Sequence, residues 1–264
     1  MNPRMNRAQA LRHCFAKGEP VFGGHVFFTD PEITEAMAFH GFSFLWIDGE
    51  HCAFDLQELL RHIQACAAGG TASIVRVAWN DPVRAKPVLE MGPDGILFPY
   101  VCTGEEARAA VAACCYPPLG IRGFGPRRAN QYGALSNDAY LDQVNDSFLR
   151  IVQIEHVNAV RNLRDIAAVE GIDLLMVGPN DLSASIGKLG RINSPESRAL
   201  YDEIATVCKA VGKPFGVSLG GEDRQAIREW VDRGAVMIGC GYDLGYVSKG
   251  AQETLAFVET LKKP

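Results

Sequence analysis

A short polar cluster follows one of the most apolar stretches of the chain. Residues 42–47 are apolar except for Ser43, and they lead directly into Asp48, Glu50 and His51. A carboxylate beside an imidazole at the end of a buried strand can act as a general acid and base. The same side chains can simply cap the next helix, so the cluster alone does not establish a catalytic site. Strand alternation places Glu50 on the face opposite His51, which predicts a supporting role, or a contact with a metal-bound water, at most.

Four more polar residues stand at the ends of later apolar runs: Arg76, Gln153, Glu155 and Asp181. Each alone has a structural explanation, such as a paired core arginine or an acid that caps a helix. If the runs are parallel strands of one barrel, however, their carboxyl ends share a rim, and that rim is the active face of such folds. Their coincidence there predicts a functional site.

The two later acids predict a metal site. Glu155 and Asp181 are expected at the ends of neighbouring strands, which lie about 4.8 Å apart, so their carboxylates can converge on one hard divalent cation. Two protein ligands leave positions open for water or substrate, as in catalytic Mg²⁺ or Mn²⁺ sites. A zinc site is less favoured, because no histidine or cysteine pair stands beside these acids.

An open metal site beside an arginine suits an α-keto acid. Arg76 would stabilise the enolate oxygen that develops on a metal-bound pyruvate enolate, and His51, oriented by Asp48, would move the protons. This arrangement predicts a class II aldolase, which reversibly cleaves a 4-hydroxy-2-keto acid to pyruvate and an aldehyde. None of the eight lysines lies in the C-terminal half of a predicted strand, so we expect no Schiff-base lysine. The glycines at 120, 123 and 125 do not form a dinucleotide fingerprint, and we expect neither NAD nor PLP.

Eight short apolar runs alternate with helical patterns along the chain. This alternation predicts an α/β fold, a (β/α)₈ TIM barrel, as a single domain over residues 1–264. A helix at 5–17 is expected to close the barrel floor, and glycines are expected to end the helices before several strands. The predicted strands are 21–28, 42–48, 72–78, 94–101, 148–155, 172–178, 213–219 and 235–240, and the predicted helices between and after them are 31–40, 55–68, 81–91, 103–115, 156–170, 194–211, 222–233 and 251–262.

Two connections are longer than the others. Residues 179–193 follow a predicted strand and therefore lie on the active face, and residues 116–147 are expected to reach it, because long loops in compact domains are usually functional. The roles of the 116–147 loop and of Arg127 within it stay open.

Composition limits the partners. The net charge is −5, and no block of lysine or arginine attracts nucleic acid or a membrane surface, so small molecules are the expected partners. The eight cysteines contain no CxxC pair and are expected to be reduced thiols of a cytoplasmic protein. No secretory signal opens the chain, and no apolar run is long enough to span a membrane.

Taken in order, several motifs resemble the HpcH/HpaI aldolases, which are metal-dependent class II pyruvate aldolases of the 4-hydroxy-2-oxoheptanedioate and 2-keto-3-deoxy sugar acid type. The resemblance covers nearly the whole chain. It rests on Gly41-Phe42, Asp48-Gly-Glu-His51, Val75-Arg76-Val77, Leu97-Phe98-Pro99, Tyr116-Pro-Pro-Leu-Gly-Ile-Arg-Gly123, Gln153-Ile-Glu155, Gly171-Ile-Asp173 and Gly178-Pro-Asn-Asp-Leu-Ser183.

The resemblance implies a role for each matching residue. Glu155 and Asp181 would hold Mg²⁺, Mn²⁺ or Co²⁺, His51 with Asp48 would transfer protons, and the pyruvyl group would contact Arg76 and Gln153. It also implies substrate contacts from Asp181 and Ser183, and a C-terminal helix that packs onto a neighbouring subunit in a homo-oligomer, a trimer or hexamer. The chain departs from the family pattern at Gly49, Cys52 and residues 27–30.

The remaining questions concern the reaction partner. Trp79, Phe124, Arg127 and the pair Ser218-Leu219 are candidates for the aldehyde pocket, with a core or rim role as the alternative. Competing activities are oxaloacetate decarboxylation and lysis of an acyl-CoA ester of the malyl or citramalyl type, since both use similar enolate chemistry. A third reading is a non-catalytic sensor of keto acids.

Overall fold

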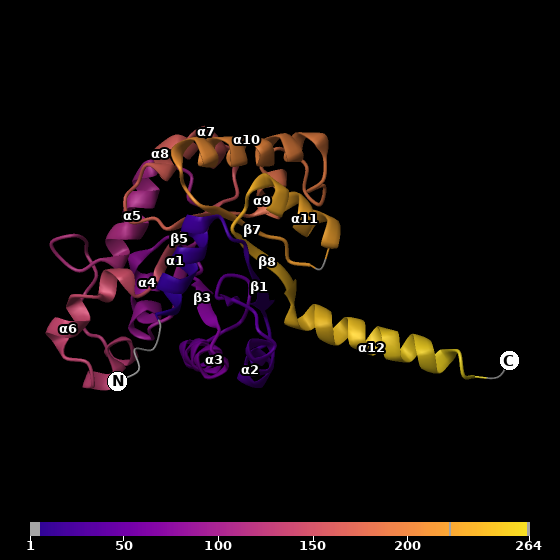
Figure 1. Cartoon of the computed structure of the whole chain (residues 1–264), viewed down its shortest axis with the longest axis horizontal. Helices are drawn as coiled ribbons and strands as arrows, with labels where there is room; N and C mark the ends of the chain where they lie inside the picture. The colour runs from indigo at the N-terminus through magenta and orange to yellow at the C-terminus, as the bar shows by residue number, and fades with distance from the viewer. Residues whose placement is uncertain (1–5, 222, 263–264) are drawn as a thin grey trace.

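Eight parallel strands form a closed barrel, as the alternation of the sequence predicts. The computed structural model describes residues 6–221 and 223–262. Neighbouring strands pair in chain order, and the last strand closes onto the first. The strands are β1 (Val21–Val26), β2 (Phe44–Asp48), β3 (Ala72–Arg76), β4 (Gly95–Phe98), β5 (Leu149–Ile154), β6 (Leu174–Val177), β7 (Phe215–Ser218) and β8 (Met237–Tyr242) (Figure 1).

Each strand is followed by helical structure. Local sequence signals begin and end these helices: Asp55 and Thr103 form capping boxes at two starts, and Gly70 and Gly212 adopt left-handed backbone at two ends. The helices are α1 (Arg7–Lys17), α2 (Pro31–Phe39), α3 (Leu56–Gly69), α4 (Pro82–Glu90), α5 (Gly104–Cys114), α6 (Asn137–Leu141), α7 (Val157–Arg161), α8 (Leu163–Ala167), α9 (Pro179–Ala184), α10 (Pro195–Val211), α11 (Arg224–Arg233) and α12 (Asp243–Glu259), with 3₁₀ turns at Arg128–Gly133 and Val144–Asp146.

Side chains of the strands alternate between two apolar clusters. Trp46 and Ile74 belong to the cluster inside the barrel, whereas Val75 belongs to the cluster between the barrel and its helices. Asp48 and Arg76 lie two residues beyond Trp46 and Ile74, so they also face inward, at the carboxyl rim. Both are buried, at 2% and 8% exposure. The alternation therefore delivers these polar groups to the barrel mouth.

Two predicted helices differ from the structure. The helix expected at 156–170 is divided at Asn162 into α7 and α8. The last helix begins at Asp243 instead of residue 251, directly after β8. Its first carboxylate accepts hydrogen bonds from the backbone N–H groups of Phe27 and Phe28, both at 2.8 Å, which also explains why β1 ends before residue 28.

The segment 116–147 packs at the amino end of the barrel, contrary to prediction. Arg122 pairs with Glu90 at the end of α4, and Arg128 donates to the carbonyls of Met91 and Gly92 just before β4. These contacts lie at the start of β4, whereas the carboxyl rim lies at the opposite end of the strands. The long segment therefore buttresses the barrel floor and does not reach the active face.

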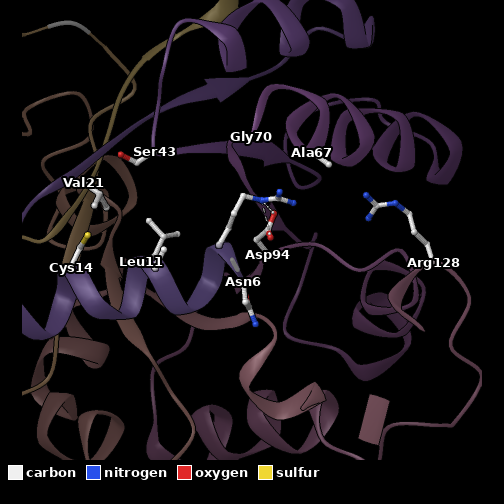
Figure 2. Close-up of a pocket in the computed structure, with 11 residues that line it drawn as sticks. Asn6, Leu11, Cys14, Val21, Ser43, Ala67, Gly70, Asp94 and Arg128 are labelled. Carbon is white, nitrogen blue, oxygen red and sulfur yellow. Dashed lines mark hydrogen bonds and ion pairs between the residues drawn. The ribbon is translucent and has the colours of Figure 1, made fainter. Parts of the chain in front are cut away.

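Helix α1 closes the barrel floor, as predicted from residues 5–17, of which residue 5 lies outside the described chain. A pocket of about 660 Å³ lies beside it (Figure 2), and Arg7 in its lining forms an ion pair with Asp94 (Nε to Oδ1, 3.1 Å). Asp94 also accepts hydrogen bonds from the backbone and hydroxyl of Ser73. Because this pocket lies at the amino ends of the strands, its polar groups serve barrel closure.

Two features bear on the environment of the protein. All eight cysteines are free thiols. Across the described part of the chain, helices are too short or too polar to cross a bilayer.

Candidate active site

Arg76 is the centre of the polar cluster at the carboxyl rim. Its Nε and Nη2 donate to the two oxygens of Asp48 at 2.9 and 2.5 Å, and its Nη1 lies 2.8 Å from Glu50 Oε2. The guanidinium also lies 5.2 Å from the centre of the Trp46 ring. Burial opposes ionisation of Asp48, but its hydrogen bonds and ion pair with Arg76 outweigh burial and lower the pKa of this carboxyl. The arginine is thus held in one orientation by a charged bidentate contact.

The expected pairing of Asp48 with the His51 imidazole is wrong. Asp48 is occupied by Arg76, and its Oδ1 accepts from the backbone N–H groups of Glu50 and His51 at 3.1 and 3.3 Å. The imidazole Nε2 instead lies 3.7 Å from Glu50 Oε2, with the His51 side chain 64% exposed.

The position of Glu50 corrects a second prediction. β2 ends at Asp48 and the chain turns, so strand alternation no longer applies at residue 50. The carboxylate turns back into the site, between Arg76 and His51. Burial, together with the charges of Asp48 and Asp181, raises the pKa of Glu50 against the opposing effects of Arg76 and His51.

Glu155 is a buried carboxylate at the end of β5. It is 3% exposed, and its Oε1 accepts a hydrogen bond from the backbone N–H of Tyr100 at 2.6 Å. Burial raises the pKa of Glu155 to about 7; the charges of Glu50 and Asp181 add to this, and the Tyr100 hydrogen bond and Arg76 oppose it. Glu155 is therefore a carboxylate in a poorly solvated position, where the charges of Glu50 and Asp181 act against its ionisation.

Gln153 and Gly178 complete this side of the rim. The side-chain oxygen of Gln153 is buried and has no hydrogen-bond partner. A β-carbon at Gly178 would lie 2.7 Å from Gln153 Nε2 and 2.8 Å from Glu155 Oε2, so only glycine lets both side chains occupy these positions. Gln153 thus presents an unused acceptor beside Glu155.

Asp181 and Ser183, from the connection after β6, differ in how far their side chains are accessible to a ligand. Asp181 lies exposed in the first turn of α9, and its charge acts on both Glu50 and Glu155. Ser183 is fully buried, and its hydroxyl donates to the carbonyl of Asn180 at 2.8 Å. The Ser183 hydroxyl proton is therefore already used within α9, and its contact with substrate stays a prediction.

The donor set fits a divalent cation bound through oxygen. Glu155 and Asp181 are mutually repelling carboxylates, and Gln153 adds an unpartnered oxygen beside them. A hard cation would neutralise that repulsion. Within residues 6–221 and 223–262, no three histidine, cysteine, aspartate or glutamate side chains gather as a closed metal cage. The arrangement thus suits an open site with few protein ligands.

Sequence reasoning missed two parts of this rim. The backbone N–H of Tyr100 binds Glu155. Tyr100 also adopts a left-handed backbone conformation with φ 55°, which a tyrosine side chain does not predict. Its ring stacks on Trp79 at 5.8 Å between centroids, which places the exposed Trp79 beside the site. His25 was also missed, although strand alternation in β1 could have indicated that it faces inward. Phe124 and Arg127 belong to the floor segment, at the opposite end of the barrel from this rim.

A closed parallel barrel with carboxylates gathered around a buried arginine at its carboxyl rim has the architecture of a (β/α)₈ barrel enzyme. Residues 24–249 match the HpcH/HpaI aldolase/citrate lyase family. The chain belongs to this family, and it is a carbon–carbon lyase.

Named relatives and solved structures agree. The chain is 37% identical over 231 residues to the 2-dehydro-3,6-dideoxy-6-sulfogluconate aldolase of Pseudomonas putida, covering 87% of this chain and 89% of that protein. It is 36% identical over 256 residues to the 4-hydroxy-2-oxo-heptane-1,7-dioate aldolase of Salmonella heidelberg (strain SL476), covering 96% of both. An HpcH/HpaI aldolase/citrate lyase family protein from Burkholderia cenocepacia J2315 superimposes with a TM-score of 0.89 at 29% identity, over 95% of this chain and 99% of that one.

Proposed function

We propose that this protein is a divalent-metal-dependent aldolase that reversibly cleaves a 4-hydroxy-2-keto acid to pyruvate and an aldehyde. One observation carries the proposal: a buried arginine is fixed by Asp48 and Glu50 beside Glu155 and Asp181. Such a cluster combines an anion-binding group with oxygen ligands for a cation, and a 2-keto carboxylate needs both. Relatives that are named aldolases of a sugar acid and of a dicarboxylic keto acid support the same reaction type.

Glu155 and Asp181 would hold the cation, Mg²⁺, Mn²⁺ or Co²⁺, with the Gln153 oxygen facing the same space. When bound, the cation supplies Lewis-acid polarisation of the keto acid. Arg76 binds the keto-acid oxygens and stabilises the negative charge that develops on the keto oxygen during cleavage. Its position is set before substrate arrives, because Asp48 fixes two of its nitrogens.

The proton transfer falls to His51 together with Glu50. The imidazole stands at the open side of the rim, and Glu50 lies between it and Arg76. An imidazole there can take the proton of the 4-hydroxyl during cleavage and return it during addition. Glu50 thus replaces Asp48 as the acid that faces the histidine.

The test is a pyruvate-release assay on 4-hydroxy-2-keto acids of differing length and charge. Activity should disappear when a chelator removes metal and return when Mg²⁺, Mn²⁺ or Co²⁺ is added. Borohydride together with pyruvate should leave the enzyme active, since no lysine forms a Schiff base. A borohydride-trapped pyruvate adduct, or full activity in the chelator, would refute the proposal.

The family also includes citrate lyases, so a second activity is tested beside the first. Oxaloacetate decarboxylation and cleavage of a malyl- or citramalyl-type thioester draw on similar chemistry at the keto oxygen. Rates on oxaloacetate, malyl-CoA and a hydroxy-keto acid, measured with one enzyme preparation, rank the three. Faster turnover of malyl-CoA would replace the aldolase assignment, and failure to turn over any of the three would favour a keto-acid sensor.

We also propose that α12 packs against a second copy of this chain, giving a homo-oligomer, a trimer or hexamer. The helix extends away from the barrel (Figure 1), and residues 251–262, which form its second half and the turn after it, are all exposed. Leu255, Phe257 and Leu261 are each at least 60% exposed. An apolar groove of about 420 Å³ lies between α2 and the start of α12, lined by Ile33 and Met37 among others. Apolar side chains on one copy and an apolar groove on another are complementary.

Light scattering coupled to size exclusion tests the assembly. Wild-type protein should run as a trimer or hexamer. A double change, Leu255→Asp with Phe257→Asp, should reduce the mass to that of smaller species. Gln252→Asp on the same helix, which adds a negative charge without removing an apolar side chain, is the control. A wild-type monomer, or an unchanged mass in the double variant, would contradict this packing.

A further inference from the structure

Two polar residues that face the barrel mouth have no part in the mechanism above. His25 lies in β1 opposite Trp46, whose ring faces the barrel interior, and Ser218 is the last residue of β7, next to the outward-facing Val217. Strand alternation therefore points both side chains into the barrel. They approach from the strands that flank β8, while Arg76 and Glu155 approach from β3 and β5.

The two side chains form one hydrogen-bonded unit. His25 Nε2 lies 2.8 Å from Ser218 Oγ, and His25 Nδ1 lies 3.0 Å from the carbonyl oxygen of Gly241. His25 is 3% exposed, whereas Ser218 is only partly buried. A β-carbon at Gly239 would come within 2.8 Å of the imidazole, so β8 leaves space for this ring. The histidine is the inner member of the pair, and the serine is the member that a ligand can reach.

The pair shares a wall with the catalytic arginine. The His25 ring lies 5.3 Å from Trp46 between centroids, and the Arg76 guanidinium lies 5.2 Å from the centre of the same ring. Trp46 is thus flanked by the keto-acid-binding arginine and by the imidazole. Trp46 itself is buried, so a substrate anchored at Arg76 would extend its remaining atoms along the mouth above this ring, toward Ser218.

The hydrogen bonds fix the direction in which the serine can act. A carbonyl oxygen only accepts, so Nδ1 of His25 carries the proton that is donated to Gly241. Burial lowers the pKa of His25, which keeps the ring neutral and leaves Nε2 as an acceptor. Ser218 therefore donates its hydroxyl proton to His25, and its two lone pairs remain to accept. A ligand group that meets Ser218 must be a donor.

We infer that Ser218 determines specificity for an aldehyde that carries a hydroxyl group next to its carbonyl, and that His25 is the positioning residue that orients the serine. The inference rests on the proposed aldolase activity and adds the substrate class. A hydroxyl donates to the serine oxygen, whereas a hydrogen at the same carbon leaves a partly buried acceptor unpaired, which disfavours the deoxy analogue.

The experiment compares two aldehydes that differ only in this hydroxyl, lactaldehyde and propanal, in the addition of pyruvate. Wild-type enzyme should prefer lactaldehyde in kcat/KM. Ser218→Ala should lower kcat/KM for lactaldehyde about tenfold, mainly through KM, and change the value for propanal less than about twofold. Ser218→Thr keeps the hydroxyl and should retain the preference. His25→Phe, which keeps a ring of similar size, should lose most of it.

A second readout separates this inference from the proposed function. Exchange of the pyruvate methyl protons with deuterated solvent needs no aldehyde, so it should be the same in wild type, Ser218→Ala and His25→Phe. Normal exchange with an equal effect of Ser218→Ala on both aldehydes, or with no effect on either, would overturn the inference alone. Absence of exchange in the wild type would overturn the proposed function and the inference with it.

Discussion

Arg76→Lys should lower kcat by at least about a hundredfold while the barrel stays folded. Lysine keeps the charge, but it cannot donate two parallel hydrogen bonds to Asp48 and reach Glu50 at the same time. Removing one preoriented donor from a site of developing negative charge typically costs a factor of about 10² to 10³. The measurement is steady-state pyruvate release with saturating metal, together with a thermal melt.

Arg12→Lys is the matched control for that variant. Arg12 makes a similar two-nitrogen contact with Asp173 on the barrel floor, at 2.7 and 3.2 Å. Its replacement should change thermal stability and leave kcat within about twofold of wild type. Arg76→Met is a harsher second variant: it leaves the buried Asp48 charge without its cation, and a loss of about 3–5 kcal/mol of stability is expected. If Arg76→Lys keeps the wild-type kcat, this arginine has no part in the mechanism.

Glu155→Gln should weaken metal binding strongly and lower activity with it. The substitution preserves shape but removes one of the two carboxylates that would hold the cation. Even groups that only support a metal ligand cost about 10 to 100-fold in affinity when removed, so the loss here should be on the order of a hundredfold or more. Titration calorimetry with Mn²⁺ measures the binding, and Glu196→Gln, a surface change beside Lys188, is the control. Unchanged Mn²⁺ affinity in Glu155→Gln would place the cation elsewhere.

The same variant has a predictable effect on the metal-free protein. The pKa of Glu155 is raised from its ordinary 4.5 to about 7, so the folded state holds a proton that the unfolded state releases. Stability that depends on this proton is present below about pH 4.5 and is lost as the pH rises through 7. Thermal melts in a chelator should therefore show a smaller decline between pH 5 and 7.5 for Glu155→Gln than for wild type.

The alternation of apolar runs with helical patterns, together with the glycines that end helices, was enough to predict the barrel. All eight predicted strands are present, because buried parallel strands appear as continuous apolar runs, and the glycines before them adopt the left-handed backbone that ends helices. The start of α12 escaped this reasoning. It depends on the contact between Asp243 and the backbone after β1, which joins residues more than two hundred positions apart.

The sequence predicted which residues lie at the candidate site better than it predicted which of them contact one another. Strand ends located Arg76, Gln153 and Glu155 at the rim, since position along a strand fixes both the face and the end. The pairing within the cluster depends on the turn after Asp48, which sends Glu50 inward and gives it the place expected of Asp48 beside His51. Alternation cannot describe a turn, and no local pattern reports which of two acids an arginine will bind.

The most direct test is proton exchange at the methyl group of pyruvate, followed by proton NMR in deuterated buffer without any aldehyde. The methyl signal should decay only when both enzyme and Mg²⁺ are present. It should persist in a chelator and in the Arg76→Lys and Glu155→Gln variants. A signal that stays constant with the metal-loaded wild-type enzyme, or that decays equally fast in the chelator, would contradict metal-dependent activation of pyruvate at this rim.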